Sequence, residues 1–198
     1  MDRKTINAQL RAQFFPVLAA EGFSRTGDIL RRELDGGVVH VVEIQHRPRS
    51  GVFQVGLGAH LVALGDVVGG EPVPVANMRD HDCAWRSSVL SGFRRGSDAE
   101  FAYGATAADA SESVAFLVSE WPRQSTAFFG GLSDFPEGFL LRAQESVFEG
   151  LHPAHLLTWA RVADILGEAE LRGRIVAAAL PRVSERATSL RANLLALS

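Results

Sequence analysis

The chain has 198 residues, of which 46% are hydrophobic and 22% charged, and its formal net charge is −3 at pH 7. This length and composition are those of a folded globular protein, which excludes disorder across the whole chain. A weakly acidic chain also lacks the basic surplus through which proteins bind nucleic acid, so we expect no nucleic-acid partner.

The chain contains a single cysteine, Cys83, so no internal disulfide can form, which suits a reducing cytoplasm. Arg3 and Lys4 are followed by polar residues at positions 5, 7, 9, 11 and 13. This stretch therefore lacks the apolar core of a signal peptide. No run of 18 apolar residues occurs, and we expect no membrane partner and a cytoplasmic location.

Apolar residues at helical spacing predict an amphipathic helix over about residues 5–21, with Ile6 and Leu10 on its buried stripe. Pro16 interrupts this pattern. Because proline removes a backbone donor, we expect it to kink or restart the helix. Gly22 is a suitable residue to end it.

Three strand-like runs follow, at about residues 24–34, 38–47 and 52–63. The sequences between them, DGG at 35–37 and PRSG at 48–51, are typical of turns. The three runs therefore predict an antiparallel meander. In the register that these loop lengths set, Ile44 pairs with Val55, Glu43 with Gly56, and Leu30 with Val42.

A stretch rich in glycine and proline, residues 64–82, predicts a long loop. Long loops in compact domains tend to be functional or mobile. Residues 84–93 predict a fourth strand, and residues 100–103 predict a short fifth one.

Helices are predicted from Thr106 onward. Thr106 and Asp109 have the spacing of a capping box. Pro122 is expected to bend or end the helix that they begin. Further along, Pro153 suits the first turn of another helix, which Gly167 ends.

The fold class that these elements predict is α+β. It consists of an N-terminal helix, an antiparallel meander sheet of four to five strands, and a helical C-terminal half. We expect an α+β domain over residues 1–148 and a C-terminal helical extension packed on it over residues 149–198.

Several short segments of the chain form a recognisable series: FPVL at 15–18, EGF at 21–23, IQ at 44–45 and FQVGLG at 53–58. They resemble a bacterial family known as domain of unknown function 4304, and the segments 83–90 and 128–134 look similar to later parts of that family. The resemblance covers roughly residues 5–148. It implies an α+β fold and no established activity, and it supplies no catalytic residue.

The candidate metal ligands have poor spacing. The HDC sequence at 81–83 places three ligand types in a row, but adjacent side chains seldom point at one ion. His152 and His155 lie three residues apart, where Pro153 already indicates a helix start. The GLG at 56–58 lacks the third glycine of a dinucleotide fingerprint. We therefore expect no metal and no cofactor, and we assign no catalytic residue.

The predicted register gathers polar side chains on the sheet face opposite the main apolar stripe. They are Arg31, Glu43, Gln45, Gln54 and His60, with Arg86 on the fourth strand. Gly56 and Gly58 lie among them, and glycine inside a strand indicates close approach by a ligand, a partner or another part of the chain, such as a C-terminal helix. If this face is open, we expect Arg31 and Arg86 to bind an acidic group.

The absence of a recognisable catalytic motif favours a non-catalytic binding module, accessory or immunity-like, that recognises another protein. One alternative is a hydrolase-like enzyme, which only Glu43 and His60 on one sheet face would support. A second alternative is a sensor of a small anionic ligand that uses the arginines of the sheet half. We expect binding rather than catalysis, because the sequence shows neither a base within reach of its proton nor a cause for a shifted pKa.

Overall fold

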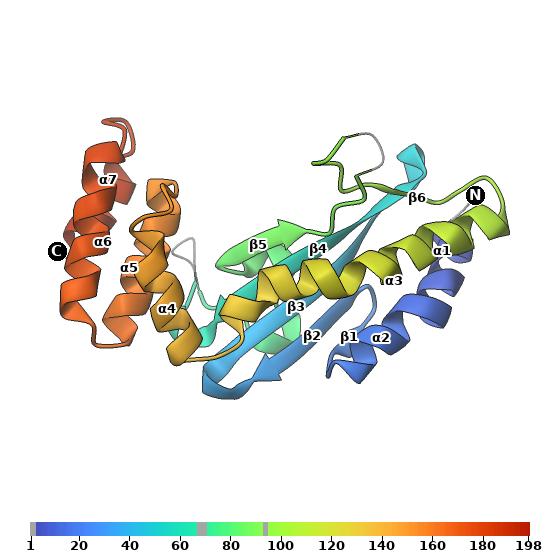
Figure 1. Cartoon of the computed structure of the whole chain (residues 1–198), viewed down its shortest axis with the longest axis horizontal. Coiled ribbons are helices and arrows are strands. Elements are labelled where there is room, and N and C mark those ends of the chain that lie inside the picture. Colours follow the sequence, from blue (N-terminus) through green and yellow to red (C-terminus); the bar gives the residue numbers. More distant parts are fainter. Residues whose placement is uncertain (1–2, 67–70, 93–94) are drawn as a thin grey trace. The chain divides into compact units, whose positions relative to one another are not determined.

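The computed structural model describes residues 3–66, 71–92 and 95–198. Contacts between residues divide the chain into two compact units. The first unit is formed by residues 1–34, 39–60 and 73–130, and the second by residues 35–38, 61–72 and 131–198. The first unit contains almost all of the sheet, and the second contains the helices of the C-terminal third (Figure 1).

The expected N-terminal helix is present as three consecutive helical segments. α1 spans Arg3–Gln9, a π-helical turn spans Leu10–Phe14, and α2 spans Phe15–Ala20. Pro16 lies in the first turn of α2, where a missing N–H is tolerated, and the wider π turn before it accommodates the interrupted hydrogen-bond ladder. The predicted restart at Pro16 is confirmed. Gly22 then ends the helix with a φ of 86°, which glycine adopts without strain.

The strands form one antiparallel sheet, as predicted. They are β1 (Ser24–Thr26), β2 (Ile29–Leu34), β3 (Val38–Arg47), β4 (Val52–Leu61), β5 (Trp85–Ser88) and β6 (Phe101–Ala102). Their order is β1-β2-β3-β4-β5, and β6 pairs with the beginning of β4. This meander, with a helix before it and helices after it, confirms the α+β class.

The run expected as one strand over residues 24–34 forms two strands. A tight turn at Gly27 and Asp28 divides it, and Thr26 pairs with Ile29 across the turn. Gly27 has a φ of 67°, in the left-handed region that two-residue hairpins require. The single glycine is therefore enough to reverse the chain.

The turns between β2 and β3 and between β3 and β4 occupy the residues expected for them. The Ile44 amide donates a hydrogen bond to the Asp28 carbonyl over 2.8 Å. The rings of His46 and Phe53 lie 6.3 Å apart across the two longest strands. Both contacts agree with the register that the turn lengths predict.

The helix α3 (Ala107–Phe129) crosses one face of the sheet and contacts α1 (Figure 1). The predicted capping box begins it. The Asp109 amide donates to the Thr106 hydroxyl over 3.1 Å, and the Thr106 amide donates to the Asp109 carboxylate over 3.0 Å. Pro122 lies inside the helix and does not end it. Buried residues on both sides of the proline hold the two halves of the helix in place.

Trp121 anchors α3 to the N-terminal helices. Its ring meets Phe14 edge to face, with 5.2 Å between centroids, and its Nε1 donates to the Glu21 carboxylate over 2.8 Å. Farther along α3, Phe129 stacks on His40 of β3 at 4.2 Å. The face of β3 that carries His40 therefore packs on α3, and the alternate residues of β3 point to the other face.

Gln124 of α3 holds the chain that continues beyond β5. Its side-chain amide accepts a hydrogen bond from the Leu90 N–H over 2.7 Å and donates one to the Leu90 carbonyl over 2.8 Å. A residue of a neighbouring antiparallel strand would make the same pair of bonds.

The second unit contains the helices α4 (Glu137–Ser146), α5 (Pro153–Ile165), α6 (Ala169–Ala179) and α7 (Thr188–Leu195). His152 caps α5, because its Nδ1 accepts a hydrogen bond from the Ala154 amide over 3.2 Å. The structural interpretation of His152 is confirmed, and Pro153 occupies the first helical turn as predicted.

Helix α4 belongs to the same unit as α5, α6 and α7. The division expected from the sequence falls after residue 148, whereas contacts group residues 131–198 together. Among the described residues, no helix combines the length and the apolar character needed to cross a membrane.

Candidate functional site

We call the sheet face that carries Arg31, Glu43, Gln45, Gln54 and His60 the polar face. Residues 73–83 pack on this face, and we call them the covering segment. Met78 and Cys83 of this segment form a buried cluster with Val39 and Val41 of β3. Much of the stretch expected as a long loop therefore folds back onto the strands. The loop and the polar face, which the sequence suggests as separate candidates, form one site.

Gly56 and Gly58 of β4 allow the covering segment to approach the sheet closely. A Cβ on Gly58 would lie 2.6 Å from Cys83 Sγ and 3.1 Å from Asp80 Cα, and a Cβ on Gly56 would overlap the Asp80 carboxylate. The close approach expected at these glycines is therefore present, and the approaching group is another part of the same chain.

Glu43 fastens the covering segment to β3. Its side chain is only 3% exposed, and Arg79 donates hydrogen bonds to both carboxylate oxygens, one of them from Nε over 3.2 Å. The Asp80 amide donates to the same carboxylate over 3.4 Å. A bidentate arginine–carboxylate pair is stronger and more directional than a single hydrogen bond. Glu43 is therefore an anchor for the covering segment.

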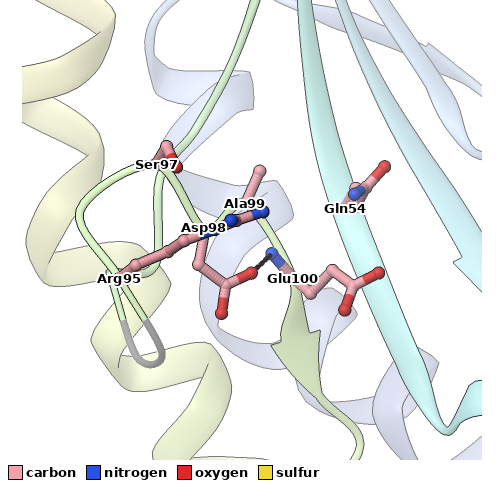
Figure 2. A pocket seen from close by; sticks show the side chains of 6 residues that line it. All are labelled: Gln54, Arg95, Ser97, Asp98, Ala99 and Glu100. Carbon is pink, nitrogen blue, oxygen red and sulfur yellow. Dashed lines mark hydrogen bonds between the residues drawn. The ribbon is translucent and has the colours of Figure 1, made fainter.

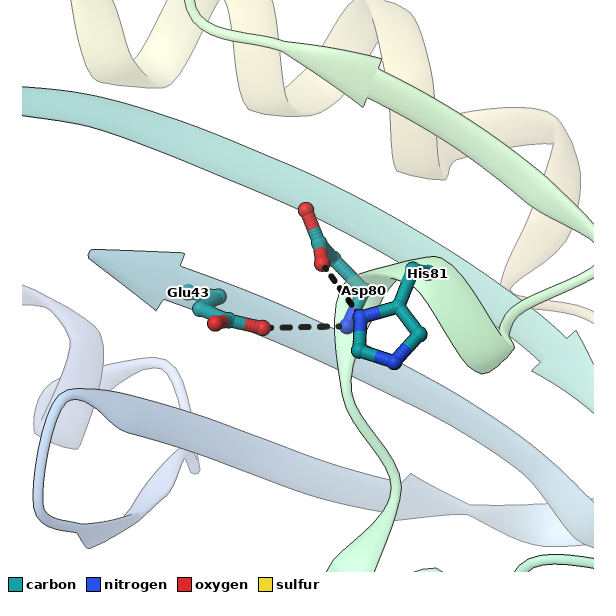
Figure 3. A group of neighbouring side chains, drawn as sticks. All are labelled: Glu43, Asp80 and His81. Carbon is teal, nitrogen blue, oxygen red and sulfur yellow. Dashed lines mark hydrogen bonds and ion pairs between the residues drawn. The ribbon is translucent and has the colours of Figure 1, made fainter. Parts of the chain in front are cut away.

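Asp80 lies beside Glu43 on the turn of the covering segment (Figure 3). Its Oδ2 accepts a hydrogen bond from Gln45 Nε2 over 2.7 Å, and its Oδ1 lies 3.7 Å from His81 Nδ1. The His81 side chain is 55% exposed. The turn therefore presents an imidazole to solvent and keeps the two carboxylates beneath it.

The environment shifts the pKa values of the two carboxyls in opposite directions. Burial alone would raise the pKa of Glu43, but the hydrogen bonds from Arg79 and its charge lower that pKa below its ordinary value. Burial and the charge of Glu43 both raise the pKa of Asp80. The two groups therefore titrate together, with Glu43 as the more acidic member.

Glu43, Asp80 and His81 are described residues that could hold a cation, because their ligand atoms lie within 4.8 Å of one another. However, Arg79 already binds both oxygens of Glu43. A metal ion would have to displace this guanidinium group, so the residues fit a cation poorly. The expectation that the protein needs no metal and no cofactor stays a prediction.

Arg31 has an internal partner. The residue is 8% exposed, and its Nε donates to the Met78 carbonyl of the covering segment over 2.6 Å. Burial lowers the pKa of its guanidinium group. Arg31 therefore binds the covering segment. The external acidic group that was expected as its partner on an open face is replaced by a carbonyl of the same chain.

The other predicted site residues lie at separate positions. His60 is buried on β4, and Arg86 is exposed on β5, where it pairs with Gly58. Gln54 lines a separate pocket of about 540 Å³. The other residues that line this pocket are on the chain leading to β6 (Figure 2). These residues are Arg95, Ser97, Asp98, Ala99 and Glu100. Of the predicted set, the structure brings Arg31, Glu43 and Gln45 together under the covering segment.

Cys83 is a buried thiol that donates to the Arg79 carbonyl over 3.3 Å. Burial, followed by the charges of Asp80 and Asp82, raises the pKa of this thiol well above its ordinary value. Because the thiolate is the nucleophilic form, Cys83 is unsuited to nucleophilic catalysis.

A pocket of about 790 Å³ lies beside the covering segment. Residues from α1, the β1–β2 turn, β3 and the covering segment line it: Arg3, Thr26, Gly27, Asp28, Ile29, Glu43, Ile44, Gln45, His46, Arg47, Arg79 and His81. Three of its lining residues are arginines from separate segments of the chain. We call it the arginine pocket.

Each arginine of this pocket is the more exposed member of an ion pair. The side-chain exposures are 51% for Arg3 against 31% for Asp28, 54% for Arg47 against 21% for Glu100, and 51% for Arg79 against 3% for Glu43. Each arginine therefore has one carboxylate partner, and each of these carboxylates is less exposed than its arginine. The surface of the pocket therefore presents guanidinium groups to solvent.

Sequence reasoning counts Arg47 and Arg79 only among the arginines of the sheet half that could bind an anionic ligand, and it assigns Arg3 and Asp80 to no site. A signal for Arg79 and Asp80 is the charged run RDHD at 79–82, which follows the glycine-rich stretch. Arg3 and Arg47 have no comparable local signal, because only the tertiary fold brings them to the pocket.

Comparison with protein-family models, with curated proteins and with solved structures finds no match for this chain. The resemblance to domain of unknown function 4304 therefore stays a prediction.

Proposed function

We propose that this protein is a non-catalytic binding module that recognises another protein. Its recognition surface is the exposed side of the covering segment together with the arginine pocket. One observation supports this proposal most directly. The groups best suited to chemistry hold the covering segment in place, whereas the exposed groups around the pocket are hydrogen-bond donors.

Three potentially reactive side chains, those of Glu43, Asp80 and Cys83, support this argument. Arg79 engages both oxygens of Glu43, Gln45 donates to Asp80, and the Cys83 thiol is buried. A catalytic base must reach the proton that it removes, and a nucleophile must reach its electrophile. These groups are already committed to contacts within the protein. Recognition needs only an accessible and chemically distinctive surface, and exposed arginines are frequent at such surfaces.

The alternative is a hydrolase-like enzyme, and one observation favours it. The pKa of Asp80 is raised beside a second carboxyl whose pKa is lowered. Active sites that use one carboxyl as an acid and the other as a base show this arrangement. The two functions differ in their response to Asp80→Asn. An enzyme that uses Asp80 loses turnover, whereas a binding module keeps its partner.

A matched pair of charge reversals tests the binding proposal. Arg47 and Arg49 are both exposed and lie two residues apart, but only Arg47 lines the pocket. The wild type, Arg47→Glu and Arg49→Glu are used to capture proteins from the native host, with quantification by mass spectrometry. We expect a protein that the wild type and Arg49→Glu retain and that Arg47→Glu loses. Capture of the same proteins in equal amounts by all three would contradict the proposal.

A further inference from the structure

We propose that the arginine pocket is an oxyanion site, which takes a carboxylate or phosphate group. This inference deepens the proposed function and rests on it in one respect: the oxyanion is the group through which the partner protein engages this surface. The binding of an oxyanion by itself needs no partner and can be measured separately.

The pocket collects cations that are distant in the sequence. Arg3 begins α1, Arg47 ends β3, and Arg79 belongs to the covering segment. All three line one pocket, together with the β1–β2 turn at Gly27 and Asp28. Guanidinium groups that converge from separate elements match an anion with several oxygens, because each can donate to a different oxygen.

The three arginines keep donors that their ion pairs do not use. Arg47 contacts Glu100 through Nη1, and Arg3 contacts Asp28 through Nη2. Arg79 uses Nε and Nη2 on Glu43, so its Nη1 has no carboxylate in that pair. A guanidinium group has five N–H donors, and these contacts leave several of them available. A bound oxyanion would therefore add hydrogen bonds without breaking the existing ion pairs.

Because the carboxylates are less exposed than the arginines, the pocket favours a ligand with negative charge. Glu43 is almost fully buried under Arg79, and Asp28 is less exposed than the arginine that it pairs with. A cation entering the pocket would meet guanidinium groups first, whereas an anion would meet complementary charge. Because such interactions weaken as salt screens them, affinity should fall with ionic strength.

The neutral wall of the pocket is consistent with a site whose charge comes from arginine. His46 lines it, and its Nδ1 lies 2.9 Å from the Tyr103 hydroxyl. Burial lowers the pKa of His46, which favours the neutral form of its ring. The arginines stay charged throughout the physiological range.

The test titrates the full chain with inorganic phosphate and, separately, with succinate, at low ionic strength. Calorimetry measures affinity, and amide chemical shifts locate binding. We expect saturable binding of at least one probe, with shifts at Gly27, Asp28 and Ile44. Arg47→Gln should weaken it by about five- to tenfold, which corresponds to the loss of one charge-assisted contact. Arg49→Gln should leave it unchanged.

Arg47→Gln is preferred to Arg79→Gln because it leaves the anchor at Glu43 intact. Binding of phosphate alone identifies a phosphorylated group as the source, and binding of succinate identifies a carboxylate. Failure of both probes, or equal affinity in Arg47→Gln and wild type, would overturn the inference. Loss of a protein partner in Arg47→Glu without any oxyanion binding would leave the proposed function standing and the inference refuted. Oxyanion binding without any protein partner would support the oxyanion site and refute the proposed function.

Discussion

The Asp80 carboxylate lies in the space that a side chain at Gly56 would occupy, so the absence of a Cβ in β4 allows the covering segment to pack as it does. Gly56→Ala should therefore destabilise the protein by about 1–3 kcal/mol, the usual range for overpacking. Urea denaturation measures this loss.

A double variant and a control make the cause specific. Gly56→Ala combined with Asp80→Ala should regain part of the stability, because the overlapping carboxylate is gone. Gly173→Ala, in α6, is the control: a Cβ there has no heavy atom within 4 Å. It should stabilise the helix by roughly 0.5–1 kcal/mol. Equal losses in the single and double variants would show that Asp80 is not the obstacle.

Arg79→Gln should destabilise the protein at neutral pH by about 1–3 kcal/mol, because it leaves the buried Glu43 carboxylate without its cation. Solvent reaches the half-exposed Arg79 guanidinium, so we expect the lower part of this range. The pKa of Glu43 is lowered in the folded state, so its stabilising effect exists at neutral pH and is lost as pH falls through the folded pKa.

The loss in Arg79→Gln should therefore shrink in acid. Unfolding curves at neutral pH and at about pH 4 would show it. The double variant Glu43→Gln and Arg79→Gln should recover much of the stability, and Arg49→Gln should change it little. A loss that is independent of pH would mean that packing by Arg79, and not its charge, matters.

Asp80→Asn should make the protein more stable at neutral pH. Burial and the charge of Glu43 raise the pKa of Asp80, so ionising it reduces stability as pH rises through the folded pKa. Asparagine keeps the shape and the acceptor for Gln45 but has no charge. The advantage over wild type should disappear in acid, where Asp80 is protonated. Asp35→Asn, at an exposed turn, should be neutral at either pH. A less stable Asp80→Asn at neutral pH would refute this account.

Thr106→Ala should destabilise the protein by about 1 kcal/mol, the usual effect of removing a helix N-cap. The Thr106 hydroxyl accepts from the Asp109 amide, and the Thr106 and Ala105 amides lower the pKa of Asp109 by donating to it. Thr106→Ser keeps the hydroxyl and should retain most of the stability. A thermal melt in which serine and alanine lose equally would show that the hydroxyl is not the stabilising group.

Local sequence predicts the sheet well because its determinants are local. The turn residues 35–37 and 48–51 fix where β3 begins and ends, and the capping box at Thr106 fixes the start of α3. The hairpin at Gly27 is missed because one glycine interrupts an otherwise continuous strand-like run. The run contains no longer turn sequence to mark the reversal.

The site is less predictable because its contacts are between distant parts of the chain. Glu43 and Gln45 are found from strand alternation, but their partners Arg79 and Asp80 are 36 and 35 residues away. No periodicity marks the covering segment. The glycine at position 56 is the local trace of its approach, and it does not say which group approaches.

The hydrogen bonds between Gln124 and Leu90 oppose edge-to-edge aggregation of this protein. An unfinished sheet edge is a template on which identical chains stack into fibres. Here β5 is four residues long, and the amide of Gln124 occupies the backbone donor and acceptor of Leu90 just beyond it. The helix that packs the core therefore also terminates the sheet. On this side of the sheet, the described edge strand β5 is short and ends beside this contact.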